Sequence, residues 1–179
     1  MILLRHGQTI FNAVFGLTRI DPGIPDPPLT AEGRRQIAAV AEALAREPLT
    51  RLVASPYTRA LETAELLAGR LQLAVTIDPL ISEQGHFACD IGTLRSGLAS
   101  RWPAHDFGEL PERWWPEGSE SQADFLARCR RFRRRAADLP DWRETLVVTH
   151  WGVIRALTQR SVANGEWVRY EPASAADPG

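Results

Sequence analysis

The N-terminal segment constrains the fold most, because a short buried strand ends there in two polar residues. Residues 2–4 (Ile-Leu-Leu) form a continuous apolar run, which is typical of a strand buried on both faces. Gly7 interrupts this pattern, so Arg5 and His6 stand where the strand ends and a loop begins. In open parallel α/β sheets, ligands bind at that end of the strands. A guanidinium beside an imidazole suits an anion such as phosphate, and an Arg-His pair in a surface turn is the alternative.

A second strand leads directly into a helix. Residues 52–54 are another short apolar run, and the sequence predicts that Ser55 caps the following helix with Pro56 at its first position. Arg59 then falls in the first turn of that helix, beside the positive end of its dipole. A surface helix arginine is the alternative, although an arginine is better placed there when an anion lies nearby.

A third strand ends in the same way. Residues 146–149 form the last clear buried strand, and His150 follows it directly. Because parallel strands point in the same direction, we expect the polar residues at these strand ends to gather at one edge of the sheet. Two arginines, two histidines and a helix N-terminus in one place form a phosphate pocket by charge alone.

The remaining pattern predicts an α/β fold, a three-layer α/β/α sandwich with a mostly parallel central sheet. Thr30 is expected to cap a helix that ends near Pro48, and Ser119 or Ser121 to cap another that ends near Leu139. We expect one domain over residues 1–170 and a loose tail over 171–179. Further expected elements are strands at 73–77 and 166–170, a short helix at 93–101, and an irregular proline-rich loop at 21–28.

Composition excludes several classes of function. All 21 basic residues are arginine, which excludes a Schiff-base or P-loop lysine. The net charge of −1 argues against a nucleic-acid-binding protein, so we expect the arginines at 128–135 to form a solvated helix face. The two cysteines and four histidines lack the spacing of a zinc site. No apolar run approaches the about 18 residues of a membrane span, and a cytoplasmic location is expected.

Several stretches together resemble the histidine phosphatase superfamily, whose fold is that of phosphoglycerate mutase. They occur in the family's order and cover most of the chain. The stretches are LLRHGQT with Asn12 (3–12), PLTAEG (28–33), SPYTRALETA (55–64), LISE (80–83) and VVTHWGVIR (147–155).

The resemblance implies roles for particular residues in these stretches. His6 would be the nucleophile that takes the phosphoryl group, and the Gly7 carbonyl would orient its ring through a hydrogen bond. Neither a metal nor another cofactor would be needed, because arginine and histidine supply the positive charge. The side chains expected to hold the phosphate oxygens are Arg5, Asn12, Arg59 and His150.

Glu83 matches the position of the family's proton donor. A carboxylic acid that donates a proton near pH 7 needs a raised pKa, through burial or through the charge of the phosphate. The same residue would then activate the water that hydrolyses the phosphohistidine. Asp90 and His86 are nearby alternatives for the proton donor.

The chain departs from the family pattern in two loops and at one residue. Residues 16–21 and 85–92 differ from the usual stretches, and Trp151 stands where glycine is frequent. Substrate contacts from the first loop therefore cannot be transferred. The aromatic residues within 102–116 could form an apolar wall at the site, although we expect them to be core residues beneath a loop.

We therefore predict metal-independent hydrolysis of a small phosphorylated metabolite through a phosphohistidine on His6. A phosphoglycerate mutase and a phosphohistidine-protein phosphatase are the alternatives that use the same residues. A non-catalytic phosphate-binding domain is the alternative from another class. We expect neither nucleic acid nor a membrane as partner, and a monomer or a homodimer formed through the strand at 166–170.

Overall fold

The computed structural model describes residues 1–173 and contains one five-stranded sheet in the order β3-β2-β4-β1-β5. The strands are β1 (Ile2–Arg5), β2 (Arg51–Ala54), β3 (Val75–Ile77), β4 (Thr145–Thr149) and β5 (Trp167–Arg169). Four strands run parallel, and β5 pairs antiparallel with β1 at one edge. The mostly parallel sheet is confirmed. The predicted tail at 171–179 falls largely outside the described residues.

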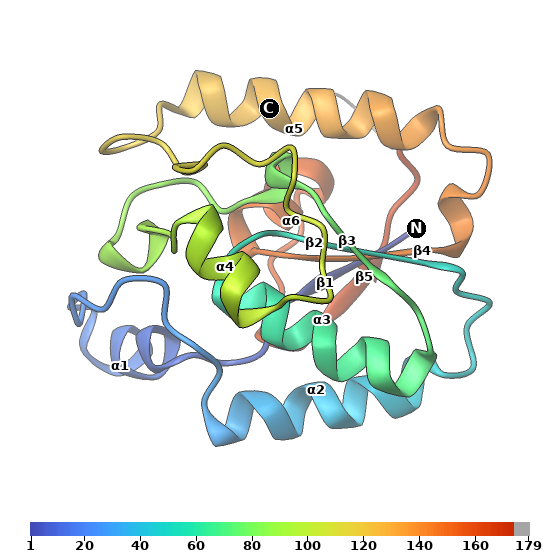
Figure 1. Ribbon diagram of the computed structural model, residues 1–179, viewed down its shortest axis with the longest axis horizontal. Coiled ribbons are helices and arrows are strands. Elements are labelled where there is room, and N and C mark those ends of the chain that lie inside the picture. Colours follow the sequence, from blue (N-terminus) through green and yellow to red (C-terminus); the bar gives the residue numbers. More distant parts are fainter. Residues whose placement is uncertain (174–179) are drawn as a thin grey trace.

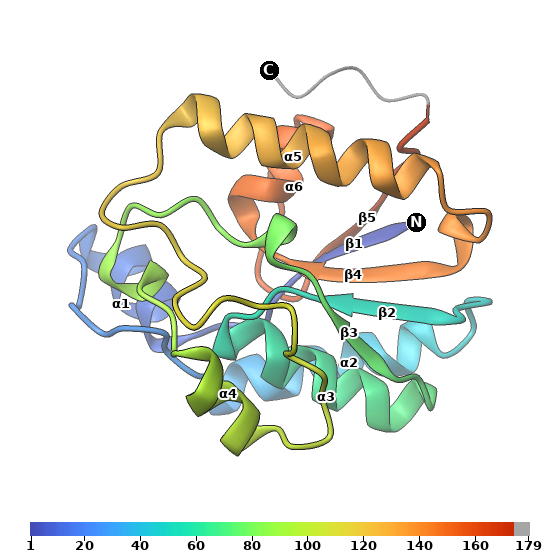
Figure 2. The same cartoon turned by 45° about the horizontal axis from the view of Figure 1, so that its top comes forward.

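Helices cover both faces of this sheet, so the three-layer prediction is also confirmed. In Figures 1 and 2, α2 and α3 lie on one face, and α5 and α6 lie on the other. No helix in residues 1–173 is long and apolar enough to cross a membrane. The helices are α1 (Ile10–Thr18), α2 (Ala31–Leu44), α3 (Thr58–Leu71), α4 (Arg95–Arg101), α5 (Gln122–Ala137) and α6 (Trp151–Thr158), with 3-10 turns at Pro79–Ile81, Ala88–Asp90 and Trp142–Glu144.

The apolar runs of the central strands are explained by burial on both faces. Alternate side chains of a strand point to opposite sides. Leu4 and Val148 pack with α2 and α3, whereas Leu3 and Val147 pack with α5 and α6. Successive residues of these strands must therefore both be apolar. The alternation of apolar and polar residues that is typical of a half-exposed sheet is absent.

The register of β1 and β4 brings two predicted site residues together. Arg5 stands opposite Thr149 in this parallel pair, and the backbone N–H of His6 donates to the Thr149 carbonyl at 3.0 Å. His6 and His150 therefore emerge side by side, with ring centroids 5.2 Å apart. This placement follows directly from two neighbouring strands that end at the same edge.

The predicted start of α3 is wrong. The helix begins at Thr58 rather than at Pro56, and its N-cap residue, Tyr57, provides no side-chain cap. Instead Asp26, in the proline-rich loop, accepts hydrogen bonds from the Thr58 backbone N–H at 2.9 Å and from its hydroxyl at 2.7 Å. The cap comes from a residue distant in sequence, and the Ser55 hydroxyl contacts His150 instead.

The prediction of a solvated arginine face on α5 is wrong at Arg128. That side chain is only 12% exposed and pairs with Glu120, through Nε and Oε1, at 2.7 Å. Its guanidinium also donates to the carbonyls of Leu80, Ser82 and Glu83 at 3.0, 2.6 and 2.9 Å. Arg128 therefore holds the chain segment that carries the predicted proton donor.

The aromatic residues within 102–116 are mostly core, as expected. Trp102 and Phe107 belong to the same buried apolar cluster as side chains of α2 and α3, and Trp114 packs against it. The Trp114 indole N–H donates to the Thr93 carbonyl at 2.8 Å. None of these rings is among the residues that line the pocket described below.

Candidate active site

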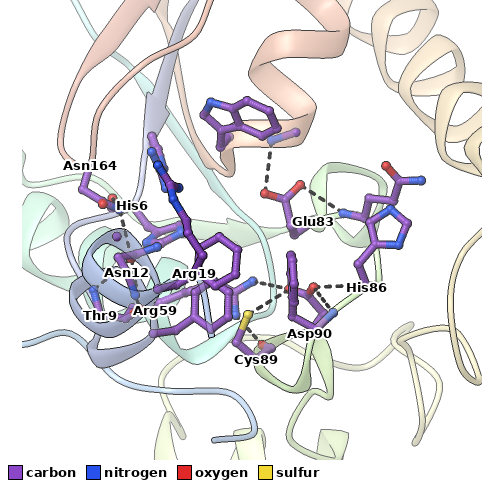
Figure 3. Close-up of a pocket in the computed structure, with 18 residues that line it drawn as sticks. His6, Thr9, Asn12, Arg19, Arg59, Glu83, His86, Cys89, Asp90 and Asn164 are labelled. Carbon is purple, nitrogen blue, oxygen red and sulfur yellow. Dashed lines mark hydrogen bonds and ion pairs between the residues drawn. The ribbon is translucent and has the colours of Figure 1, made fainter. Parts of the chain in front are cut away.

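A pocket of about 540 Å³ opens beyond the carboxyl ends of β1 and β4 (Figure 3). It collects side chains from β1, α1, α3, the loop at 83–90, the start of α6 and the segment before β5. The lining residues that bear polar side chains are Arg5, His6, Thr9, Asn12, Arg19, Arg59, Glu83, Gln84, His86, Cys89, Asp90, Trp151 and Asn164.

His6 is buried and held in one orientation. Its Nδ1 lies 2.7 Å from the Gly7 carbonyl oxygen, so Nδ1 carries the proton and donates it. Burial lowers the pKa of His6 well below its usual value, and the charges of Arg59 and Arg5 lower it further. The ring is therefore neutral near pH 7, with the lone pair on Nε2 available for nucleophilic attack.

Arg59 is fixed by three contacts on one side of the pocket (Figure 3). Its guanidinium donates to the Cys89 carbonyl at 2.7 Å and to Asp90 Oδ1 at 3.0 Å. The same guanidinium lies over the Tyr57 ring, 4.2 Å from its centroid. The arginine therefore keeps its position and charge without a bound anion.

Arg5, the last residue of β1, and Asn12, in the first turn of α1, line another part of the pocket. Arg5 donates to the Val162 carbonyl at 2.9 Å, while its buried Nε has no partner among the described residues. Asn12 Oδ1 accepts from the Thr9 backbone N–H at 3.0 Å and from the Asn164 amide at 3.1 Å. These bonds fix the amide of Asn12 and leave its Nδ2 as the donor toward the pocket.

His150 is completely buried behind this group. Its Nε2 lies 2.8 Å from the Ser55 hydroxyl, and its Nδ1 has no partner within the described chain. Burial lowers the pKa of His150 well below its usual value, with Arg59 and His6 adding to the effect. The side chain touches the site through the neighbouring rings of His6 and Tyr57, and it is not among the lining residues of the pocket.

Glu83 faces the same pocket from the loop after the Pro79–Ile81 turn. Its carboxylate accepts from the backbone N–H groups of Gly152 at 3.1 Å and Gln84 at 3.0 Å. Burial raises the pKa of Glu83, and Asp90 raises it further. A Cβ at position 152 would overlap the Glu83 carboxylate, so only glycine permits this approach.

The two alternatives to Glu83 are placed differently. Asp90 is committed to Arg59 through Oδ1, and its Oδ2 accepts the backbone N–H groups of His86 and Phe87 at 3.2 and 3.1 Å. The His86 side chain is exposed at the pocket edge. Glu83 combines a raised pKa with a carboxyl group that faces the pocket.

Two features of the pocket were missed by the sequence reasoning. Asn164 donates to the His6 carbonyl at 3.2 Å as well as to Asn12, but it lies in an irregular segment without any pattern. Helix α1 carries a capping box, Thr9 with Asn12, which could have been found from the spacing of these two residues. In residues 1–173, no group of three or more histidine, cysteine, aspartate or glutamate side chains is placed to hold a metal ion.

A family model described as the histidine phosphatase superfamily, branch 1, matches residues 1–173. The chain belongs to the histidine phosphatase superfamily. The match spans every element of the fold and all the predicted site residues, so the resemblance stated from the sequence is confirmed.

Relatives of the chain carry phosphatase and mutase names. It is 32% identical to the glucosyl-3-phosphoglycerate phosphatase of Mycolicibacterium vanbaalenii, over 88% of this chain and 72% of that protein. It is 30% identical to a Yersinia enterocolitica protein named Probable phosphoglycerate mutase GpmB, over 84% of this chain and 68% of that protein. Together with the family model, these relatives identify the chain as an enzyme of the histidine phosphatase superfamily.

Solved structures of the superfamily share the fold. A mycobacterial glucosyl-3-phosphoglycerate phosphatase in complex with VO3 has a TM-score of 0.65 and 26% identity, and covers 98% of this chain and 94% of that one. An α-ribazole phosphatase from Shigella flexneri has a TM-score of 0.65 and 27% identity, over 93% and 87%.

Proposed function

We propose that this enzyme hydrolyses phosphate monoesters of small metabolites through a phosphohistidine on His6, without a metal ion. The observation that carries the proposal is the bond from His6 Nδ1 to the Gly7 carbonyl, which leaves Nε2 free in a neutral ring. A neutral imidazole nitrogen is a competent nucleophile toward phosphorus near pH 7.

The charge around His6 supports transfer of a phosphoryl group. Arg5 and Arg59 line the pocket together with His6, and both guanidinium groups can bind equatorial phosphate oxygens. The buried Nε of Arg5, a residue that lines the pocket, has no partner in the described chain, and an oxyanion in the pocket would satisfy its hydrogen bond. A mycobacterial relative has been solved with VO3 and with inorganic phosphate, which agrees with an oxyanion site in this family.

The reaction then has two steps. In the first, His6 Nε2 attacks phosphorus as the ester oxygen leaves, and Glu83 gives that oxygen its proton. In the second, Glu83 takes a proton from a water molecule, which attacks the phosphohistidine and releases inorganic phosphate and His6. A raised pKa of Glu83 suits both roles. The acid form persists to higher pH than in an ordinary glutamate, and the carboxylate left after proton donation is a stronger base.

Phosphoryl transfer of the mutase type is a second candidate, supported by the 30% identity to the GpmB protein. It requires that the intermediate be protected from water until a second hydroxyl accepts the phosphoryl group. Conversion of 3-phosphoglycerate to 2-phosphoglycerate, without release of inorganic phosphate, would favour it over hydrolysis. A cytoplasmic location and a monomeric or homodimeric state stay predictions.

The experiment is turnover of p-nitrophenyl phosphate in EDTA, with a His6→Ala variant beside the wild type. We expect turnover that survives the chelator and disappears in the variant. Turnover that needs an added metal, or that persists in His6→Ala, would contradict the proposal. The Leu17→Ala variant changes an exposed side chain outside the pocket and is the matched control.

A further inference from the structure

Three phenylalanine rings form one side of the pocket, and the proposed hydrolysis uses none of them. Phe11 and Phe15 lie one turn apart on α1, with ring centroids 5.2 Å apart and an angle of 12° between planes. Phe87, in the loop after Glu83, contacts them at centroid distances of 5.3 and 5.1 Å. We call Phe11, Phe15 and Phe87 the phenylalanine wall.

The phenylalanine wall faces the pocket rather than the interior. All three rings line the cavity, and none belongs to the two buried clusters that flank the sheet. Phe87 is 41% exposed, and Phe11 and Phe15 are partly exposed. Apolar surface gathered in a pocket and left open to water is typical of a binding site, because a ligand gains free energy by covering it.

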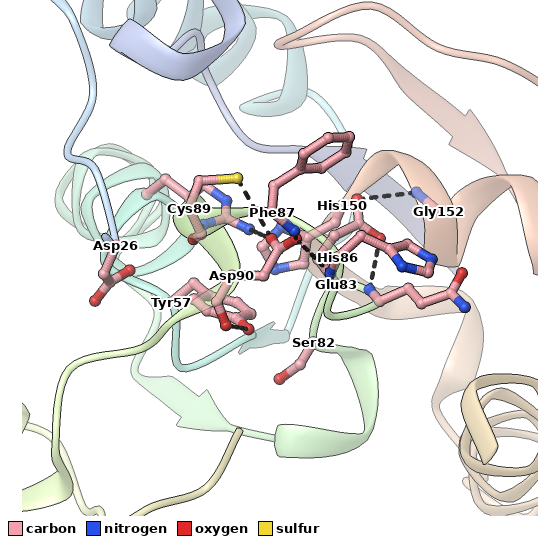
Figure 4. A network of polar contacts seen from close by, with 12 residues as sticks. Asp26, Tyr57, Ser82, Glu83, His86, Phe87, Cys89, Asp90, His150 and Gly152 are labelled. Carbon is pink, nitrogen blue, oxygen red and sulfur yellow. Dashed lines mark hydrogen bonds and ion pairs between the residues drawn. The ribbon is translucent and has the colours of Figure 1, made fainter. Parts of the chain in front are cut away.

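The wall is fixed relative to the phosphate-binding side chains. Asp90 Oδ2 accepts the Phe87 backbone N–H at 3.1 Å (Figure 4). Asp90 Oδ1 binds Arg59 at 3.0 Å. The Asp21 carboxylate accepts the Ala88 backbone N–H at 2.8 Å, which ties the Phe87 loop to the segment that follows α1. A phosphate held by Arg59 therefore meets the wall at a set distance and orientation.

The chemistry of the wall selects a class of leaving group. Phenylalanine offers ring faces and edges but neither a donor nor an acceptor for hydroxyl groups. A polyol placed against it would lose hydrogen bonds to water without replacement, whereas a flat apolar ring would bury surface and stack. At one end, the Arg19 guanidinium lies 5.9 Å from the Phe15 centroid, where it can also stack on a ring.

We propose that the phenylalanine wall binds the leaving group, and that the preferred substrates are phosphate monoesters of alcohols that carry an aromatic or other flat apolar ring. This proposal rests on the proposed hydrolysis and names the substrate class for the same site. The proposed substrate class differs from the glucosyl-3-phosphoglycerate that the name of one relative specifies.

The test compares two esters of primary alcohols, 2-naphthylmethyl phosphate and glycerol 1-phosphate, so that the bond broken is the same in both. We expect kcat/KM of the wild type to favour the naphthylmethyl ester by about tenfold or more. Phe87→Ala and Phe15→Ala should each reduce this ratio toward one, and Phe87→Leu should retain part of it. Leu17→Ala, on the solvent side of α1, should leave the ratio unchanged.

Equal kcat/KM for the two esters in the wild type would overturn the proposal. So would an equal loss on both esters in the alanine variants, which would make the wall merely structural. Calorimetry with 2-naphthylmethylphosphonate and methylphosphonate tests binding without turnover. Tighter binding of the naphthyl compound, lost in Phe87→Ala, supports the wall even if hydrolysis fails, and equal affinities overturn it.

Discussion

Arg59 and Asp90 form an ion pair that is almost fully buried, with Arg59 Nη2 donating to Asp90 Oδ1 at 3.0 Å and both side chains 3% exposed. The second oxygen of Asp90 holds the backbone N–H groups of His86 and Phe87. One carboxylate thus positions both the guanidinium proposed to bind phosphate and a ring of the phenylalanine wall. Asp90 is a positioning residue in this account rather than a proton donor.

Asp90→Asn should destabilise the protein and weaken catalysis. The amide keeps the size of the side chain but leaves the Arg59 charge buried without its partner, which typically costs about 3–5 kcal/mol. Urea denaturation should show a loss of that order in the free energy of unfolding, and saturating phosphate should restore part of it by pairing with Arg59. Glu112→Gln breaks an exposed pair with Arg95 and should change little. Unaltered stability in Asp90→Asn would contradict the positioning role.

Glu83→Gln should impair the enzyme according to the leaving group. An alkoxide must be protonated as it leaves, whereas p-nitrophenolate departs without a proton. We expect kcat/KM to fall by about 10²–10⁴-fold for 2-naphthylmethyl phosphate and far less for p-nitrophenyl phosphate. His86→Gln should change kcat/KM by the same factor for both esters. An equal loss on both esters in Glu83→Gln would exclude Glu83 as the proton donor.

The pH dependence of kcat/KM should reflect opposite pKa shifts of Glu83 and His6. Burial, then Asp90, raises the pKa of Glu83, so its acid form is lost only as the pH rises through that raised value. The rate ratio of the alkyl ester to the aryl ester should therefore fall with rising pH, and this fall should vanish in Glu83→Gln. Burial lowers the pKa of His6, so neutral His6 should persist below pH 6.5. A ratio that rises with pH would contradict this assignment.

Arg128→Lys should affect the active site through the backbone of residues 80–83. The ammonium group cannot replace a planar guanidinium that donates to three carbonyls and to Glu120. We expect a loss of about 1–3 kcal/mol in unfolding free energy, and a larger loss of kcat/KM for alkyl than for aryl esters. Arg131→Lys, at an exposed position of α5, is the matched control. Equal unfolding free energies and equal kcat/KM values in Arg128→Lys and Arg131→Lys would contradict the role of Arg128.

The convergence of the site residues could be predicted from the sequence because strand ends are a local signal. Short apolar runs that end in polar residues located His6 and His150. The parallel pairing of β1 and β4 then places the two residues at the same edge of the sheet. The predicted cap of α3 failed because Asp26, which satisfies the Thr58 N–H, lies 32 residues away. Helical periodicity carries no information about such a distant partner.

Other features depended on contacts that no sequence pattern encodes. The arginine run of α5 has the composition of a solvated face, yet Arg128 turns toward three carbonyls of another segment. Phe11 and Phe87 belong to separate segments and meet only in the fold. The sequence pointed to the aromatic residues of 102–116 as a possible wall, whereas the phenylalanine rings that line the pocket come from α1 and the loop at 83–90.

The central claim, a phosphoryl group carried on His6 Nε2, is tested most directly by trapping the intermediate. The enzyme is mixed with p-nitrophenyl phosphate in EDTA, quenched in alkali within milliseconds, digested and examined by mass spectrometry. We predict an acid-labile, alkali-stable phosphoryl group on the peptide that contains His6, and none on that peptide from His6→Ala. Rapid turnover without any label on His6, or the label on another residue, would contradict the account.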